Sequence, residues 1–186
     1  MSNQRVASRY AKSIMELSLE KGRLEEVHAD FERLTALASS NRELGFVLKN
    51  PIINSDKKLN ILKALFAKDA EPLTLTFFEI VSRKNREEIL LDVGKEFENQ
   101  YNLHNSIQVA QVTTTFTIDD KLREEFKSVV KDISGKNTVQ LVEKIDLELI
   151  GGYILKVNDR QLDESLSSKL RQLKSEFVQN HYESKI

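Results

Sequence analysis

The chain has 186 residues, of which 28 are Lys or Arg, 29 are Asp or Glu and none is Cys or Trp, so disulfides and thiolate metal sites are excluded. Its 40% apolar and 31% charged residues are typical of a globular protein, and its length suits one mid-sized domain or two small ones. Acidic and basic residues balance in each half of the chain, so no nucleic-acid partner is expected.

The first predicted helix runs from about Gln4 to Glu20, because apolar residues recur there at helical spacing. They form two adjacent rows, Val6, Tyr10, Ile14 and Leu17 in one and Ala7, Ala11, Met15 and Leu19 in the other. Such a helix can bury one row in its own domain and offer the other row to a partner. The basic residues before Glu16 also suit an organelle transit sequence, but the two apolar rows favour a structural helix.

Five further helices are predicted before residue 105, from apolar spacing and from helix start and stop signals. They are Leu24 to about Asn41; Arg42 to Lys49, ended by Asn50-Pro51; a helix capped by Asn54 or Ser55; one that begins at Pro72; and about Arg86 to Leu103. Six helices joined by short loops predict a compact antiparallel bundle.

After residue 105 the apolar period changes to that of mixed α and β structure. Strands are predicted at residues 107–115, 138–144 and 153–157. Between the first two strands we expect a helix that Thr117 caps and Gly135 ends. The longest uncharged run, residues 99–118, contains several Asn and Gln, so no membrane span is expected.

A last helix is predicted after a turn at Asn158-Asp159, with Asp163 as its cap. Its apolar row is expected to face inward: Leu166, Leu170, Leu173 and Phe177. The predicted fold is therefore mainly α with a small α+β part. An N-terminal six-helix bundle, residues 1–105, is followed by a C-terminal αβ domain, residues 106–186.

No cluster of residues in the sequence is typical of catalysis. Adjacent acids fall mostly in predicted first helical turns, where they complement the helix dipole. The histidines are dispersed and lack the spacing of a metal site, and Gly135-Lys136 lacks the upstream glycine of a phosphate-binding loop. We therefore expect no catalytic site, no metal and no cofactor.

The first and fifth helices carry more apolar residues than one bundle face requires. Phe77 and Phe78 are adjacent, about 100° apart on a helix, so one core would need a wide apolar stripe to bury both. Two interpretations remain open at this point: a broad bundle core, or a groove that receives an amphipathic helix of a partner.

Three segments of the sequence stand out together: Arg9-Tyr10-Ala11-Lys12, Lys84-Asn85-Arg86, and Ile145 to Val157 followed by Asp159 to Ser165. They closely resemble the delta subunit of F-type ATP synthase, whose mitochondrial counterpart is the oligomycin-sensitivity-conferring protein. The resemblance covers essentially the whole chain, and its most specific part is the segment around Gly151 and Gly152.

Two positions depart from the family pattern, since Asn158 and Glu164 stand where the family commonly has glycine. Asparagine is the residue best able to replace glycine in a left-handed turn. Gly151 and Gly152 are expected to allow a close backbone approach, and Asp163 to cap a helix, so all three are expected to be structural.

The resemblance implies a non-catalytic stator connector of F-type ATP synthase. In this family the helical domain receives the N-terminal helix of an alpha subunit in a groove between its first and fifth helices. The positions that match this groove are Tyr10, Ser13, Ile14, Leu17, Phe77, Ile80 and Val81. The connection keeps the catalytic head still while the rotor turns, so that proton flow is coupled to ATP synthesis.

The resemblance further implies that the C-terminal domain binds the membrane-anchored b subunits of the peripheral stalk. Val178 and Tyr182 of the last helix are the expected contact residues. One copy per complex is expected, at the cytoplasmic face of a bacterial cell membrane, with membrane association only through the complex. The alternatives are a helical adaptor in another multi-subunit complex and a small enzyme. The sequence supplies no candidate cluster of catalytic residues for the second alternative.

Overall fold

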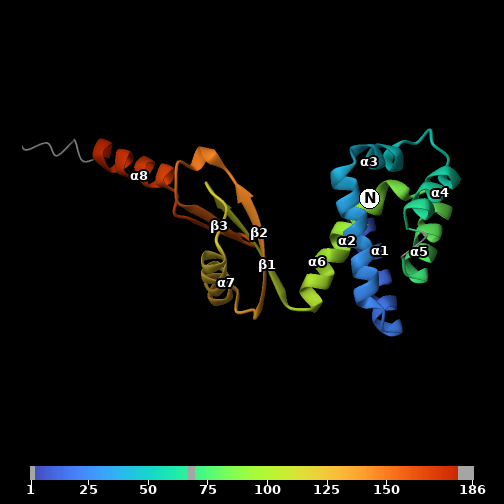
Figure 1. Ribbon diagram of the computed structural model, residues 1–186. Helices are drawn as coiled ribbons and strands as arrows, with labels where there is room; N and C mark the ends of the chain where they lie inside the picture. Colours follow the sequence, from blue (N-terminus) through green and yellow to red (C-terminus); the bar gives the residue numbers. More distant parts are fainter. Residues whose placement is uncertain (1–2, 67–69, 180–186) are drawn as a thin grey trace, which may run out of the picture. The chain divides into compact units, whose positions relative to one another are not determined.

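The computed structural model describes residues 3–66 and 70–179, and it divides into two compact units, Met1–His104 and Asn105–Ile186. The described residues are mostly helical, with one small mixed sheet, which confirms the predicted fold class in outline. Every helix before residue 105 lies in the first unit, and the sheet lies in the second (Figure 1).

The helices of the first unit begin and end within a few residues of the predicted positions. They are α1 Asn3–Lys21, α2 Leu24–Ser40, α3 Arg42–Lys49, α4 Ser55–Phe66, α5 Pro72–Arg83 and α6 Leu90–His104. The predicted start of α6 differs, because Glu87–Ile89 forms a separate 3₁₀ turn, η1, before it. Pro72 occupies the first turn of α5, where its missing N–H costs no hydrogen bond.

The core of the first unit is aromatic and centres on Phe31 of α2. Its ring stacks on Phe97 at 4.7 Å between centroids and meets Phe77 and Phe78 edge-on, at 5.8 and 6.4 Å. Helix α1 packs mainly on α6, whereas α5 packs mainly on α4, so α1 and α5 belong to different pairs (Figure 1). This pairing leaves a space between α1 and α5.

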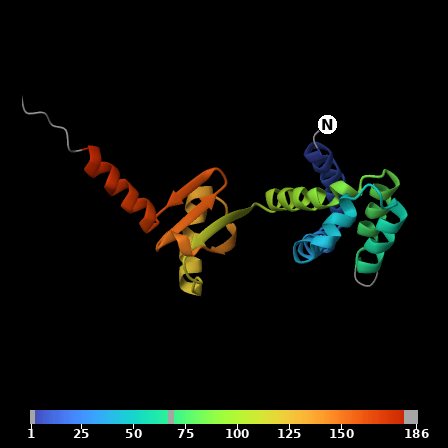
Figure 2. The ribbon, with the colours of Figure 1, turned by 90° about the horizontal axis from the view of Figure 1, so that it is seen from above.

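The second unit alternates strands and helices. Its elements are β1 Ile107–Thr114, α7 Asp120–Ser134, β2 Thr138–Ile145, the 3₁₀ turn η2 Leu147–Leu149, β3 Tyr153–Val157, β4 Arg160–Asp163 and α8 Leu166–Gln179. The sheet order is β2-β1-β3-β4. Figure 2 shows this unit, coloured from yellow to red, from above. Strands β1 and β2 are parallel and α7 connects them, while β1–β3 and β3–β4 are antiparallel.

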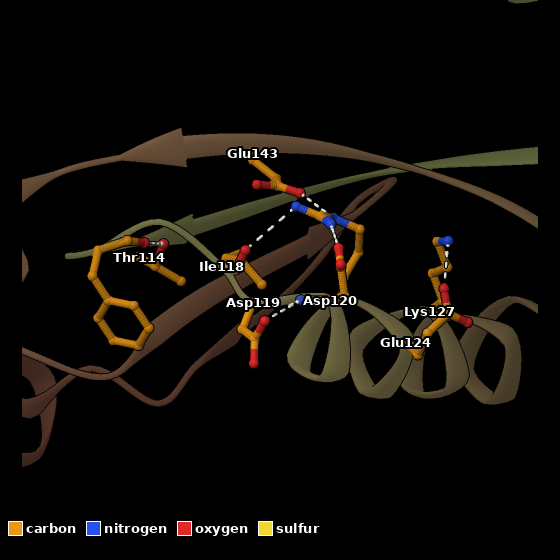
Figure 3. A network of polar contacts seen from close by, with 9 residues as sticks. Thr114, Ile118, Asp119, Asp120, Glu124, Lys127 and Glu143 are labelled. Atoms are coloured by element: carbon orange, nitrogen blue, oxygen red, sulfur yellow. Dashed lines mark hydrogen bonds and ion pairs between the residues drawn. The ribbon is translucent and has the colours of Figure 1, made fainter.

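Helix α7 covers one face of this sheet. Its Phe126 and Val130 pack against Val112 of β1 and Leu155 of β3. Arg123 links the first turn of α7 to the sheet by donating to Glu143 Oε1 of β2 at 2.7 Å. It also donates to the carbonyl of Ile118, in the loop before α7, at 3.3 Å, and pairs with Asp120. Figure 3 shows Ile118, Asp120 and Glu143 converging at this point.

The start of α7 and the segment after β3 differ from the sequence prediction. The cap of α7 is Asp119, whose carboxylate accepts a hydrogen bond from the Asp120 N–H at 2.8 Å, and not Thr117, which precedes the helix. Strand β4 was not predicted, because its four residues are exposed and show no alternation of apolar and polar side chains. It exists because its backbone pairs with β3 beyond the Asn158-Asp159 turn.

The apolar row of α8 does not face inward as predicted. Leu166, Leu170, Leu173 and Phe177, together called the α8 row, are 48, 59, 48 and 72% exposed. The spacing shows that one face of the helix is apolar, but it does not say which surface covers that face. The cap also differs, since the Ser165 hydroxyl accepts from the Ser168 N–H at 3.3 Å, and Asp163 supports it by accepting from the Ser165 N–H at 2.9 Å.

The Gly151-Gly152 segment lies directly against the start of α8. Gly152 has φ +81°, and a Cβ atom there would lie 2.3 Å from the Glu164 carbonyl oxygen. The Leu166 N–H donates to the Gly151 carbonyl at 2.9 Å. Both glycines therefore have a structural reason, because they let β3 pass close to the backbone that leads into α8.

Candidate functional site

A cavity of about 470 Å³ opens on the surface of the first unit between α1 and α5. We call it the α1–α5 groove, and its lining residues are Tyr10, Ser13, Ile14, Leu17, Lys21, Glu71, Pro72, Leu73, Thr76, Phe77 and Ile80. Its floor is closed by side chains that are nearly inaccessible to solvent, since Ile14, Phe77 and Leu73 are 3, 6 and 8% exposed. Its rims carry Leu17 and Ile80, which are 40 and 47% exposed.

The packing of α1 explains how its side of the α1–α5 groove forms. Ala7, Ala11 and Ser18 are fully buried and let α1 approach α6 closely. The neighbouring row is then turned toward α5, where the Tyr10 ring meets Phe77 edge-on at 6.2 Å between centroids. The two predicted rows divide only in part, since Leu19 of the row of Ala7 and Ala11 is 41% exposed and Ile14 of the other row is buried.

The adjacent phenylalanines of α5 divide between the core and the groove. Phe78 is fully buried against Phe66 and Phe31, whereas Phe77 forms part of the groove floor. The structure therefore shows a broad core that opens on the Phe77 side, and the docking of a partner's helix there stays a prediction.

The Ser13 and Thr76 hydroxyl groups in the groove are already bonded to their own helices. Ser13 Oγ donates to the Arg9 carbonyl at 3.0 Å, and Thr76 Oγ1 donates to the Pro72 carbonyl at 2.8 Å. Neither donor needs a partner from outside. The groove therefore behaves as an apolar surface, which an apolar helix face can cover without leaving a buried donor unpaired.

The acidic side chains beside the groove are paired with cations. Glu79 accepts from Lys63 Nζ at 2.5 Å, and this hydrogen bond holds the pKa of Glu79 below its usual value. The Glu71 carboxylate lies 4.0 Å from Arg23 Nε. Lys21, in contrast, has no carboxylate partner among the residues that the structure describes.

The structure brings six of the seven residues predicted for the groove together. Tyr10, Ser13, Ile14 and Leu17 line it from α1, and Phe77 and Ile80 line it from α5. Val81 does not line it, because this side chain is fully buried in the core. Val81 follows Ile80 by about 100° around α5, which turns its side chain to the side of the helix that packs into the core.

Five lining residues were missed by sequence reasoning: Lys21, Glu71, Pro72, Leu73 and Thr76. Most of them continue the same helical spacing, since Lys21 follows Leu17 by four residues and Thr76 precedes Ile80 by four. Extending each apolar row by one turn, regardless of polarity, would have found Lys21, Leu73 and Thr76, whereas Glu71 and Pro72 lie further away at the start of α5.

The second unit offers a different apolar surface, the α8 row. Its members are spaced by four, three and four residues, which is the seam of a helix that packs along another helix. Of the two predicted stalk residues, Val178 lies in α8, but the structure does not describe its side chain, and Tyr182 lies outside the described residues.

The described residues meet neither the requirements of a metal site nor those of a membrane-spanning helix. Among residues 3–66 and 70–179, no three His, Asp or Glu side chains gather as metal ligands would. No helix in the same ranges has the length and apolar character needed to cross a bilayer.

Comparison with known proteins gives a consistent result. The family model described as ATP synthase delta (OSCP) subunit matches residues 6–177. The ATP synthase subunit delta of Cytophaga hutchinsonii is 38% identical over 96% of this chain and 97% of its own, and that of Amoebophilus asiaticus is 37% identical over 95 and 96%.

A solved structure shares the fold. A chain of the Toxoplasma gondii mitochondrial ATP synthase hexamer superposes with a TM-score of 0.72, at 19% identity, over 92% of this chain and 97% of that one.

Proposed function

The chain belongs to the family of ATP synthase delta (OSCP) subunits, which are stator components of the peripheral stalk of F-type ATP synthase. From this membership we propose that its two units bind different parts of that complex. The first unit, as a six-helix bundle, binds the catalytic head, and the second binds the stalk. The joint keeps the head from rotating with the rotor, so that proton flow drives ATP synthesis.

The first unit receives the N-terminal helix of an alpha subunit in the α1–α5 groove. The single observation that carries this proposal is the groove itself, with its closed apolar floor and with the Ser13 and Thr76 hydroxyls bonded to their own helices. An amphipathic helix laid into it would cover Leu17 and Ile80, which are 40 and 47% exposed in this structure. The contact residues are Tyr10, Ser13, Ile14, Leu17, Phe77 and Ile80.

Calorimetric titration of the full chain with a peptide of the cognate alpha-subunit N-terminus tests this proposal. We expect one-to-one binding with a negative heat-capacity change, because apolar surface is buried. A control peptide with its apolar residues changed to serine should not bind. If the unaltered peptide does not bind, the groove is not the site that contacts the catalytic head, and the fold assignment is unaffected.

The second unit binds the b subunits through α8. The α8 row supports this, because it is apolar, has the spacing of a helix-packing seam and is exposed in the described chain. Val178 and Tyr182 remain predicted stalk residues, and the α8 row is added to them. One copy of the chain per complex joins one head to one stalk.

The proposed location follows from these partners. The chain is a peripheral subunit of a membrane complex and lies at the cytoplasmic face of a bacterial cell membrane, held there by the complex. No catalytic role, cofactor or metal is proposed. Family membership favours this function over the alternative of a helical adaptor in another multi-subunit complex.

A further inference from the structure

Two of the sequence motifs, Arg9-Tyr10-Ala11-Lys12 and Lys84-Asn85-Arg86, meet at one end of the α1–α5 groove. Arg86 Nη1 donates to Tyr10 Oη at 3.2 Å, and the guanidinium carbon lies 5.9 Å from the centroid of the Tyr10 ring. Arg86 is not itself a lining residue of the cavity. Its contact with Tyr10 places an exposed guanidinium at the mouth of the groove.

The turn before Arg86 is fixed by several hydrogen bonds. Asn85 has φ +51°, a left-handed conformation that asparagine tolerates, and its Oδ1 accepts from Ser55 Oγ at 2.7 Å. The Arg86 N–H donates to the Val81 carbonyl at 3.2 Å. The backbone between α5 and η1 is therefore held in one conformation, which directs Arg86 toward Tyr10.

The charges around the groove favour an acidic group on the occupant. A guanidinium has five N–H donors, and Tyr10 Oη uses one of them. At the opposite end, Lys21 lines the cavity. Within residues 3–66 and 70–179 neither Lys21 nor Arg86 has a carboxylate partner, whereas the lining carboxylate of Glu71 lies 4.0 Å from Arg23 Nε. The groove thus has an apolar floor and a cation at each end.

We propose that Arg86 is a specificity-determining residue of the groove, and that its guanidinium pairs with a carboxylate of the docked alpha-subunit helix. This inference rests on the proposed function of the groove. Tyr10 Oη holds the guanidinium in position, so that little freedom is lost when the pair forms. The lining from Tyr10 to Lys21 spans roughly 16 Å, about three helical turns. The preferred helix therefore carries an acidic residue at the Tyr10 end of its apolar face.

A double-mutant cycle between the full chain and the alpha-subunit peptide tests the pairing. In the chain, Arg86→Gln removes the charge and keeps hydrogen-bond donors; in the peptide, each Asp or Glu is changed in turn to Asn or Gln. We expect Arg86→Gln to raise the dissociation constant about three- to tenfold and to weaken its dependence on salt. One acidic peptide residue should show coupling, so that its replacement costs nothing further in the Arg86→Gln background.

Matched variants separate the pairing from general effects of charge and folding. Lys84→Gln removes a neighbouring exposed cation and should leave affinity unchanged within about twofold. Tyr10→Phe keeps the ring but removes the hydroxyl, and its effect should be smaller than that of Arg86→Gln and not additive with it. Thermal unfolding of each variant checks that the fold is intact.

The outcomes distinguish this inference from the function on which it rests. If the unaltered chain binds no peptide, the groove proposal fails and the pairing fails with it. If the peptide binds, but Arg86→Gln binds equally well or no acidic residue shows coupling, the groove proposal stands and the pairing is overturned. An equal loss in Lys84→Gln also overturns it, because net charge alone would then explain the effect.

Discussion

Ile80 is the residue at which the groove can be tested with the least disturbance of the fold. Its side chain lines the cavity yet is 47% exposed, so Ile80→Asp should change the free energy of unfolding little. In the complex the new carboxylate would be buried without a partner. We expect peptide binding to weaken by about 3 kcal/mol, roughly a hundredfold in dissociation constant.

The matched control for Ile80 is Ile52→Asp, the same exchange at a side chain that is 86% exposed and lies away from the groove. Its peptide affinity, measured by calorimetric titration, should equal that of the unaltered chain. Equal affinity of both variants would place the docked helix somewhere other than against α5.

Gly152 is expected to be intolerant of any side chain. Gly152→Ala would combine a left-handed φ of +81° with a Cβ that lies 2.3 Å from the Glu164 carbonyl oxygen. Gly135→Ala is the matched control, since φ is +68° there and no atom lies within 4 Å of the added Cβ. Chemical denaturation should show a loss of about 1 kcal/mol for Gly135→Ala and clearly more for Gly152→Ala. Equal losses would mean that the close approach to Glu164 is unimportant.

At the residue scale, the sequence located the groove but not its full lining. Helical spacing identified Tyr10, Ile14 and Leu17 correctly, because a row on one helix face stays together in space. It could not separate Ile80 from Val81, because both neighbours are apolar and the side that the core takes depends on how α5 packs on α4.

At the scale of elements, α8 provides the prediction for the stalk. Leu170→Glu together with Leu173→Glu should abolish co-elution with the soluble part of the b subunits, because both side chains belong to the exposed α8 row. The free energy of unfolding should change little, since neither side chain is buried. Ser175→Glu places one charge on the opposite face of α8 and should leave co-elution intact. Retained binding by the double variant would exclude the α8 row as the stalk contact.

The attachment of α7 to the sheet predicts a dependence of stability on pH. The hydrogen bond from Arg123 lowers the pKa of Glu143 from its usual 4.5. A carboxyl whose pKa is lower in the folded state stabilises the fold above its unfolded pKa, and this contribution is lost as pH falls through the folded value. Glu143→Gln should therefore be less stable than the unaltered chain at pH 7 and should lose less stability below pH 4.5.

Urea unfolding of the full chain at a series of pH values, followed by a probe in the second unit, measures this difference. Parallel pH profiles for Glu143→Gln and the unaltered chain would show that the Arg123 contact contributes nothing to stability.

The elements themselves were largely predictable, with instructive exceptions. Long amphipathic helices and Pro72 as a start signal have local causes, so their positions follow from the sequence. The position of strand β4 does not follow from the sequence, because β4 depends on pairing with β3. The exposure of the α8 row does not follow from it either, because the spacing of these residues does not say which surface covers them.

At the scale of the whole molecule, the account requires both units to act in one chain. The groove belongs to Met1–His104 and the α8 row to Asn105–Ile186, so each proposed contact can be removed separately. Loss of either contact should break the mechanical connection between head and stalk. The resemblance supplied this role, which no residue pattern of the chain could have indicated alone.

The most direct test of the stator function is ATP-driven proton pumping by inverted membranes from cells that lack this subunit. Added chain should restore pumping, whereas Ile80→Asp and the Leu170→Glu, Leu173→Glu double variant should each restore little, although ATP hydrolysis by the head continues. Ile52→Asp should restore pumping fully. Full restoration by either the groove variant or the α8 variant would contradict the account, because loss of one proposed contact should by itself break the connection between head and stalk.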